Sequence, residues 1–276
     1  MKSRLERLKT FGAWALVTGA SSGIGAEFAR QLAENGFNVV LAARRQDRLE
    51  ALGDTLERTY GVQTRSVCVD LSDPQGVPHL GGEVADLDIG TVISNAGTGN
   101  PGRFLDIDHD RLLELFRLNA LSHLNIAHQF GRRLAKKGGG ALLLGGAMGA
   151  ENGIPFMAND AGSKAYVQSL SRSLHVELKP AGLHVTVLVI PPTDTEVIDQ
   201  FGLDRDKMPM KPITTTQCVS EGLAALERNK ALCLPGTKNR MMRSLIPASV
   251  ARIMMGKMIE KTLLSVKAPF KTMPTV

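Results

Sequence analysis

A glycine-rich turn placed between a short apolar run and a helical segment constrains this chain most. Residues 13–17 are apolar, residues 18–25 read TGASSGIG, and residues 26–35 have helical periodicity before Gly36. The turn's glycines allow a tight bend, close approach of the backbone to a bound group, and close packing of the helix; they are Gly19, Gly23 and Gly25 in that order. Backbone N–H groups at such a helix start bind phosphate, so the sequence predicts a dinucleotide site.

Strands and helices alternate along most of the chain. The predicted strands are residues 13–17, 37–42, 62–69, 91–94, 140–144, 184–190 and 231–234. The predicted helices are residues 26–35, 47–60, 108–135, 160–178 and 218–229. This order predicts a doubly wound parallel α/β sheet of Rossmann type, with helices on both faces and ligands at the carboxyl ends of the strands.

The length of 276 residues fits a single domain with an extension at its end. We expect residues 1–235 to form the dinucleotide-binding domain, including a substrate loop, and residues 236–276 to form a C-terminal helical extension packed on it. Residues 240–261 mix methionine, leucine and isoleucine with spaced arginine and lysine. Three interpretations stay open: an amphipathic helix on a membrane surface, a cover over an apolar pocket, or a terminal helix packed on its own domain.

Composition excludes several classes of function. A net charge of +6 without lysine runs or interleaved aromatic residues argues against nucleic-acid binding. The three cysteines lie far apart and the six histidines are scattered, so neither set has metal-ligand spacing. We expect no metal and no disulfide scaffold. We also expect a reducing cytoplasmic location, and membrane association stays open. We find neither a signal-peptide cleavage region nor an uninterrupted apolar run of about 18 residues.

Further along the chain, Asn95-Ala96-Gly97 follows the fourth predicted strand, and Asn119 lies in the long helix. Together with the glycine turn, this pattern over residues 13–195 resembles the short-chain dehydrogenase/reductase family. The resemblance implies that Asp70 and Leu71 face an adenine and that Asn119 steadies the active-site helix and a water-mediated proton relay. A local helix cap or surface amide is the alternative for Asn119. The predicted cofactor-binding residues are Gly19, Ser21, Ser22, Gly23, Ile24, Gly25, Arg44, Arg45, Asp70, Leu71, Asn95, Ala96, Gly97, Lys164 and Thr195.

The residues after the second strand bear on which nicotinamide cofactor is bound. An acidic residue there bonds the ribose hydroxyls of NAD and repels a 2′-phosphate. This chain instead has Ala43-Arg44-Arg45. Two guanidinium groups form charge-assisted bonds with phosphate, so the sequence predicts NADP(H) rather than NAD, against the alternative of a solvated basic turn.

The chain departs from the family pattern where the chemistry occurs. The family's lysine is present as Lys164, but its tyrosine position holds Asp160, and Tyr166 points to another helix face. The family's serine position falls on Gly145 and Gly146, and its Pro-Gly after the sixth strand aligns with Ile190-Pro191. The predicted catalytic residues are therefore Asn119, Asp160 and Lys164 in a non-standard site.

Asp160 is open to three interpretations. The positive charge of Lys164 lowers the pKa of a neighbouring carboxyl group, so we expect Asp160 to be ionised and a poor proton donor. If burial instead raises its pKa, Asp160 could act as a base. A structural ion pair with Lys164 along the helix is the third interpretation.

Three functions remain, and whether the chain is an enzyme at all stays open. The first is an NADPH-dependent reductase of a hydrophobic carbonyl or hydroxyl substrate (acyl, steroid-like or polyketide-like), with water, Lys164 or a substrate group replacing the tyrosine. The second is a non-redox enzyme with Asp160 as base. The third is a silent NADP-binding sensor or partner subunit. The family resemblance implies a homo-oligomer built on the long helices, and substrate contacts from residues 196–213 and 240–276.

Overall fold

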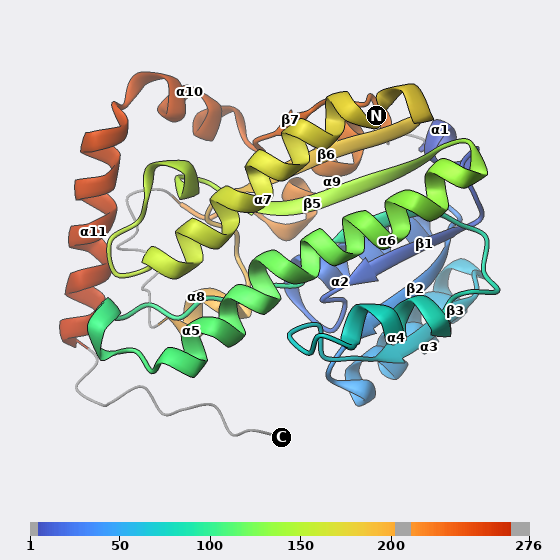
Figure 1. Ribbon diagram of the computed structural model, residues 1–276, viewed down its shortest axis with the longest axis horizontal. Helices are drawn as coiled ribbons and strands as arrows, with labels where there is room; N and C mark the ends of the chain where they lie inside the picture. Colours follow the sequence, from blue (N-terminus) through green and yellow to red (C-terminus); the bar gives the residue numbers. More distant parts are fainter. Residues whose placement is uncertain (1–4, 202–210, 266–276) are drawn as a thin grey trace.

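The computed structural model describes residues 5–201 and 211–265, which form a seven-stranded parallel sheet between two helical layers (Figure 1). The order across the sheet is β3-β2-β1-β4-β5-β6-β7. This confirms the predicted doubly wound fold. The strands are β1 (Trp14–Thr18), β2 (Asn38–Ala43), β3 (Thr64–Cys68), β4 (Ile89–Ser94), β5 (Gly140–Ala147), β6 (Leu183–Ile190) and β7 (Leu232–Cys233).

Side chains that alternate along each strand divide the core into two clusters. On β1, Ala15 and Val17 pack towards one helical layer, and Leu16 packs towards the other. The first layer consists of α1 (Glu6–Lys9), α2 (Gly23–Glu34), α3 (Gln46–Tyr60) and α9 (Thr215–Glu227). The second consists of α4 (Gly76–Glu83), α6 (Ser122–Lys137) and α7 (Ala158–Glu177).

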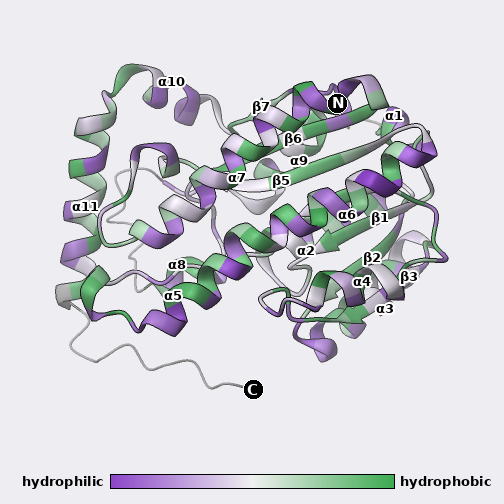
Figure 2. Ribbon diagram, in the orientation of Figure 1, coloured by the Kyte–Doolittle hydropathy of each residue, from purple (hydrophilic) through white to green (hydrophobic). Residues whose placement is uncertain are grey.

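Because both faces of the sheet are covered, the central strands are buried along most of their length and are mainly apolar, as Figure 2 shows for β5 and β6. The long predicted helix at residues 108–135 is confirmed as α5 (His109–Phe116), one π-helical turn η2 (Arg117–Leu121) and α6. Asp108 caps its start by accepting a hydrogen bond from the Arg111 N–H. A π-helical turn inside an α-helix re-aims the side chains that it carries.

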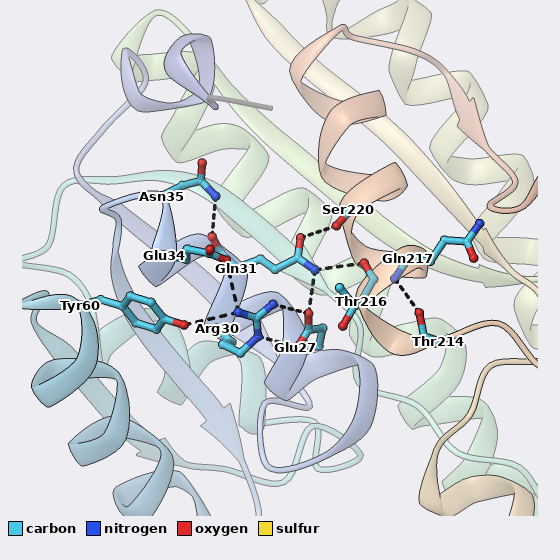
Figure 3. Close-up of polar contacts among 10 residues, drawn as sticks. All are labelled: Glu27, Arg30, Gln31, Glu34, Asn35, Tyr60, Thr214, Thr216, Gln217 and Ser220. Atoms are coloured by element: carbon cyan, nitrogen blue, oxygen red, sulfur yellow. Dashed lines mark hydrogen bonds and ion pairs between the residues drawn. The ribbon is translucent and has the colours of Figure 1, made fainter. Parts of the chain in front are cut away.

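A polar cluster fastens α2 to α9, which follows it by more than 180 residues (Figure 3). Arg30 donates two hydrogen bonds to the Glu27 carboxylate, at 2.8 and 2.7 Å. Gln31 donates to Glu27 and to the Thr216 carbonyl oxygen, and it accepts from the Ser220 hydroxyl. These bonds hold the first helix after the glycine turn against the last helix of the sheet domain.

Several elements differ from the predicted ones, among them α1, α4 and β5. The short helices α1 and α4 were not predicted, because four residues show little periodicity and α4 contains three glycines, Gly76, Gly81 and Gly82. Strand β5 continues past the predicted end at residue 144 to Ala147, since its glycines still pair with β6.

The C-terminal extension forms two helices rather than one, α10 (Thr237–Leu245) and α11 (Ala248–Ser265). Ile246 adopts an extended conformation (φ −95°, ψ 121°) before Pro247, as expected of a residue that precedes proline. Two parts of the predicted substrate-contacting segments, residues 202–210 and 266–276, lie outside the described residues.

Candidate active site

The strand order reverses between β1 and β4, so the carboxyl ends of these strands border the crevice where doubly wound sheets bind ligands. The Thr18 hydroxyl joins the two ends. It accepts hydrogen bonds from the backbone N–H groups of Asn95 (3.0 Å) and Ala96 (3.1 Å). The glycine turn after β1 and the Asn95–Gly97 turn after β4 therefore face one crevice.

Each glycine of the first turn has a structural reason. Gly19 and Gly23 have φ values of +69° and +53°, which favour glycine. A Cβ atom on Gly25 would overlap the Gly19 carbonyl oxygen, and one on Gly23 would lie 3.2 Å from the Thr195 methyl group. The turn thus presents bare backbone to the crevice, and Thr195 borders it. This is the cradle that a pyrophosphate requires.

Ser22 stands at the N-cap of α2 but does not cap the helix with its side chain. Its hydroxyl accepts a hydrogen bond from Arg45 Nη2 at 2.7 Å, and Ser21 accepts two more from Arg45, at 3.1 and 2.9 Å. The first N–H groups of this twelve-residue helix therefore receive no bond from their own N-cap side chain, which favours binding of an anion.

Basic side chains gather beside this turn. Arg45 and Arg48 flank Glu196 of α8 (Glu196–Gln200), at 3.9 and 3.1 Å. Burial, followed by the neighbouring Arg48, lowers the pKa of Arg45, so its positive charge is only partly compensated. Arg44 lies 3.9 Å from Asp70. Of the predicted arginine pair, Arg45 is therefore joined to the glycine turn, whereas Arg44 is more exposed and lies beside Asp70.

The predicted adenine residues differ in accessibility. Asp70 is half-buried and accepts hydrogen bonds from the Ser72 N–H and hydroxyl groups. The Leu71 side chain is buried among core residues, so only its main chain is available to a ligand. Ile24 likewise packs partly into the core.

Asn119 lies in the π-helical turn η2 and is fully buried. Its carbonyl oxygen accepts from the Thr98 N–H (3.0 Å), and its amide nitrogen donates to the Thr98 carbonyl (2.7 Å) and to Asp160 Oδ1 (3.4 Å). The surface-amide alternative for Asn119 is wrong, because the buried side chain links the segment that follows β4 to the start of α7.

The Asp160 carboxylate is buried, with 7% of the residue exposed. Its second oxygen accepts a hydrogen bond from the Asn100 N–H at 3.1 Å. Burial raises the pKa of Asp160 to about 6, although the Asn100 N–H, Lys164 and Arg111 act in the opposite direction. The expectation that Lys164 keeps this carboxyl pKa low is therefore wrong, because desolvation outweighs the attraction.

Lys164 does not form the proposed structural ion pair. Within the described residues, its ammonium group is not within ion-pair distance of Asp160, and Nζ donates to the Gly145 carbonyl oxygen at 3.3 Å. A Cβ atom on Gly97 would lie 2.7 Å from Lys164 Nζ and 3.0 Å from Asn119 Oδ1, so both side chains border the Asn95–Gly97 turn. Burial lowers the pKa of Lys164 to about 8.

The two glycines at the predicted serine position point to opposite faces of β5. A Cβ atom on Gly146 would lie 2.7 Å from Gln168 Cγ, inside the packing with α7. A Cβ atom on Gly145 would meet only ordinary contacts, 3.4 Å or more from the Ser94 carbonyl and neighbouring atoms. Ala147, two residues further on, shares the face of Gly145. Tyr166 is exposed on α7, as expected.

Sequence reasoning missed Asn100, Thr98 and His123. The backbone of Asn100 holds Asp160, and that of Thr98 holds Asn119. His123 is buried, bonds the Ser94 hydroxyl and the Ala96 carbonyl, and has a pKa well below its usual value because of burial. Main-chain contacts do not depend on residue type, so the sequence does not reveal them. His123, four residues after Asn119 on the same helix, was a detectable signal.

Apolar side chains lie around Gly99, next to the Asn100 N–H that holds Asp160. A Cβ atom on Gly99 would overlap the Phe201 ring and lie 3.2 Å from Met157 Cε. Met157 also packs with Ile154 and Ile259 of α11. These side chains form an apolar wall beside Gly99, the residue before Asn100, whose N–H holds the Asp160 carboxylate. Across residues 5–201 and 211–265, no three metal-binding side chains gather.

The crevice contains the glycine cradle and the basic residues that follow β2. These features define a nucleotide-binding protein of the doubly wound α/β class. The family model described as short chain dehydrogenase matches residues 13–206. The chain belongs to this family.

Two relatives named very-long-chain 3-oxoacyl-CoA reductase are similar in sequence. The protein of Neurospora crassa is 37% identical over 192 residues, which are 68% of this chain and 58% of the relative. That of Podospora anserina is 37% identical over 183 residues, covering 64% and 54%. The chain thus spans little more than half the length of these relatives.

Two solved structures share the fold. A short-chain dehydrogenase from Sphingobium yanoikuyae in complex with NADPH superposes with a TM-score of 0.75, at 27% identity, over 95% of this chain and 98% of that chain. A 7beta-hydroxysteroid dehydrogenase superposes with a TM-score of 0.81 at 22% identity, over 90% and 99%. The second likeness concerns the fold alone.

Proposed function

We propose that this chain binds NADP(H) and is an oxidoreductase acting on a hydrophobic carbonyl or hydroxyl substrate, with Asp160 in place of the family's tyrosine. The observation that carries the proposal is the buried Asp160 carboxyl group, hydrogen-bonded to Asn119 and set beside Lys164 at the crevice. The neighbour from Sphingobium yanoikuyae, solved with NADPH, supports the choice of cofactor.

The residues that would hold the cofactor fit it. The bare backbone of the glycine turn and the start of α2 would bind the pyrophosphate. Arg44 and Arg45 would bind the 2′-phosphate, and Asp70 with the Leu71 main chain would face the adenine. The turn of Asn95, Ala96 and Gly97, with Lys164 and Thr195, would line the nicotinamide half. When bound, NADPH supplies the hydride.

The protein's part is to move a proton. In reduction, the Asp160 carboxyl group would give its proton to the substrate oxygen and become a carboxylate. The Asn100 N–H, the Asn119 amide and the Lys164 charge would then stabilise that carboxylate. A pKa of about 6 brings this group much nearer to neutral pH than an ordinary aspartate, which a proton donor requires.

The substrate class follows from the surroundings of Asp160. Phe201, Met157 and the α11 side chain Ile259 give the apolar wall, and two relatives are named for 3-oxoacyl-CoA reduction. We propose a hydrophobic acyl carbonyl first, with steroid-like and polyketide-like carbonyls as alternatives. Residues 236–276 would serve as an extension of the same domain that completes the apolar wall.

A second function is favoured by the same carboxyl group. With a pKa of about 6, Asp160 is mainly ionised at neutral pH, so it could abstract a proton beside a carbonyl without redox chemistry.

A catalytically silent NADP-binding sensor or partner subunit is the third candidate function. Exposed Leu113, Phe116, Leu121 and Tyr166 on α5, η2 and α7 support a homo-oligomer built on these helices.

The test is NADPH consumption with 3-oxoacyl-CoA substrates of increasing chain length. We expect turnover that rises with chain length and falls by about 10²–10⁴ in Asp160→Asn, with Tyr166→Phe as the unchanged control. If the native protein binds NADPH but is inactive, Asp160→Tyr combined with Ala147→Ser should create activity. Failure of both proteins would reject the redox function.

A further inference from the structure

Helices α10 and α11 carry an unpartnered apolar face. Met241 and Leu245 on α10, and Val250, Ile253 and Met254 on α11, are five of the twelve exposed large hydrophobic side chains among the described residues. Leu245 is 71% exposed and Ile253 is 57% exposed. Their spacings of three and four residues place them on one side of each helix. We call these five residues the outer face.

The outer face is not required to hold the helices in place. The opposite side of α11 packs on the loop before α7: Ile259 is buried, Gly256 abuts Pro155, and Arg252 donates to the Asn152 carbonyl at 2.7 Å. Arg243 of α10 pairs with Glu151 at 2.9 Å. Both helices are therefore docked on the domain while the outer face stays in solvent. Figure 1 shows them along one edge of the molecule, apart from the sheet.

Most of the protein's net charge lies in these helices. Residues 237–265 contain six basic residues and one acidic residue, a net charge of +5, whereas the whole chain of 276 residues has +6. Among the described residues, Lys238, Lys257 and Lys261 have no acidic side chain within ion-pair distance. Figure 2 shows hydrophilic and hydrophobic segments alternating along α11. Helices α10 and α11 thus expose apolar and cationic side chains to solvent together.

We propose that the outer face of α10 and α11 binds the surface of an anionic lipid bilayer. Apolar side chains flanked by lysine and arginine on a helix favour the boundary between lipid headgroups and acyl chains, where acidic headgroups attract the cations. A second copy of this chain fits less well, because each copy would bring five positive charges to the contact. No helix in the described part of the chain is long and apolar enough to cross a membrane.

This position has a consequence that rests on the proposed function. The inner side of α11 packs with Met157 and Ile154, and Met157 belongs to the apolar wall beside Gly99. A protein bound through its outer face would hold its substrate side close to the bilayer. A long acyl chain could then pass from lipid to the site with little exposure to water.

The experiment is co-sedimentation of the full chain with vesicles of phosphatidylcholine alone or mixed equally with phosphatidylserine. We expect binding to the mixed vesicles, weakened by salt, and about tenfold weaker binding for the pair Ile253→Ser and Met254→Ser. The matched control is Val176→Ser, which removes a 71% exposed apolar side chain from α7 and should bind as the native protein does. Circular dichroism and NADPH titration verify that each variant is folded.

Three results would overturn the proposal. They are absence of binding to the mixed vesicles, equal binding by the paired Ile253 and Met254 variant and the native protein, and a concentration-dependent dimer that this variant abolishes. None of them depends on enzyme activity. A protein that binds vesicles but reduces nothing would retain this inference while the proposed function fails.

Discussion

The amide nitrogen of Asn119 lies 3.4 Å from Asp160 Oδ1, although the two residues are 41 positions apart. Asn119 is in turn fixed by both polar groups of the Thr98 backbone. Because this hydrogen bond from Asn119 is long and weak, burial is the dominant influence on the pKa of Asp160. The relationship explains why Asp160 titrates near neutral pH and leads to the first two predictions.

The first prediction concerns stability. The pKa of Asp160 is about 6 in the folded protein and near 3.8 in the unfolded chain, so the unfolded chain ionises first as the pH rises. As the pH rises from ~4 to ~6, the free energy of unfolding of the native protein should fall by about 3 kcal/mol relative to that of Asp160→Asn. Urea unfolding of both proteins at several pH values measures this. A difference that does not vary with pH would contradict the burial argument.

The second prediction concerns the pH dependence of activity. If Asp160 donates the proton, kcat/KM for reduction should fall as the pH rises through about 6, and kcat/KM for the reverse oxidation should rise through the same value. If Lys164 donates instead, the fall should occur near pH 8. The two groups interact, so the limbs belong to the pair. The reductive limb of Asp160→Asn, compared with that of the native protein, separates the two proton donors.

The third prediction concerns Glu196, which faces Arg45 and Arg48 where a 2′-phosphate would bind. Glu196→Gln should tighten NADPH binding by about threefold, as expected for loss of an exposed competing ion pair, and leave NADH binding unchanged. Glu50→Gln on α3 is the control, since Glu50 bonds only Gln46 among the described residues. Weaker NADPH binding in Glu196→Gln would show instead that Glu196 positions Arg45.

The fourth prediction concerns the glycine turn. Gly25→Ala places a methyl group on the Gly19 carbonyl oxygen, so it should destabilise the fold by about 1–3 kcal/mol and weaken cofactor binding. Gly162→Ala on α7 is the matched control, because its Cβ atom meets nothing within 4 Å. It should stabilise the helix by about 0.5–1 kcal/mol. Thermal unfolding with and without NADPH distinguishes the two effects, and equal behaviour of both variants would reject the packing argument.

The fold was predictable because its signals are local. Strand, glycine turn and helix follow in order, and apolar strands alternate with periodic helices, so chain order alone specifies a doubly wound sheet. Pro247 also marked the break between α10 and α11, but the mixed composition of residues 240–261 masked it.

The chemistry of the site was less predictable because it depends on burial. The neighbourhood of Lys164 in the sequence indicated a lowered pKa for Asp160, but the fold encloses the carboxyl group and reverses the shift. Sequence likewise could not separate Gly145 from Gly146, which differ only in the face of β5 they occupy. Main-chain donors such as the Asn100 N–H leave no trace in residue identity.

The most direct test of the account is calorimetric titration of the purified protein with NADPH and, separately, NADH. Arg44 and Arg45 at the end of β2 predict that NADPH binds at least about tenfold more tightly, the effect of a charge-assisted bond to its 2′-phosphate. Arg45→Ala should reduce that preference, weakening NADPH binding more than NADH binding, because Arg44 remains. Binding of neither cofactor, or equal binding of both, would contradict the assignment of this crevice as an NADP(H) site.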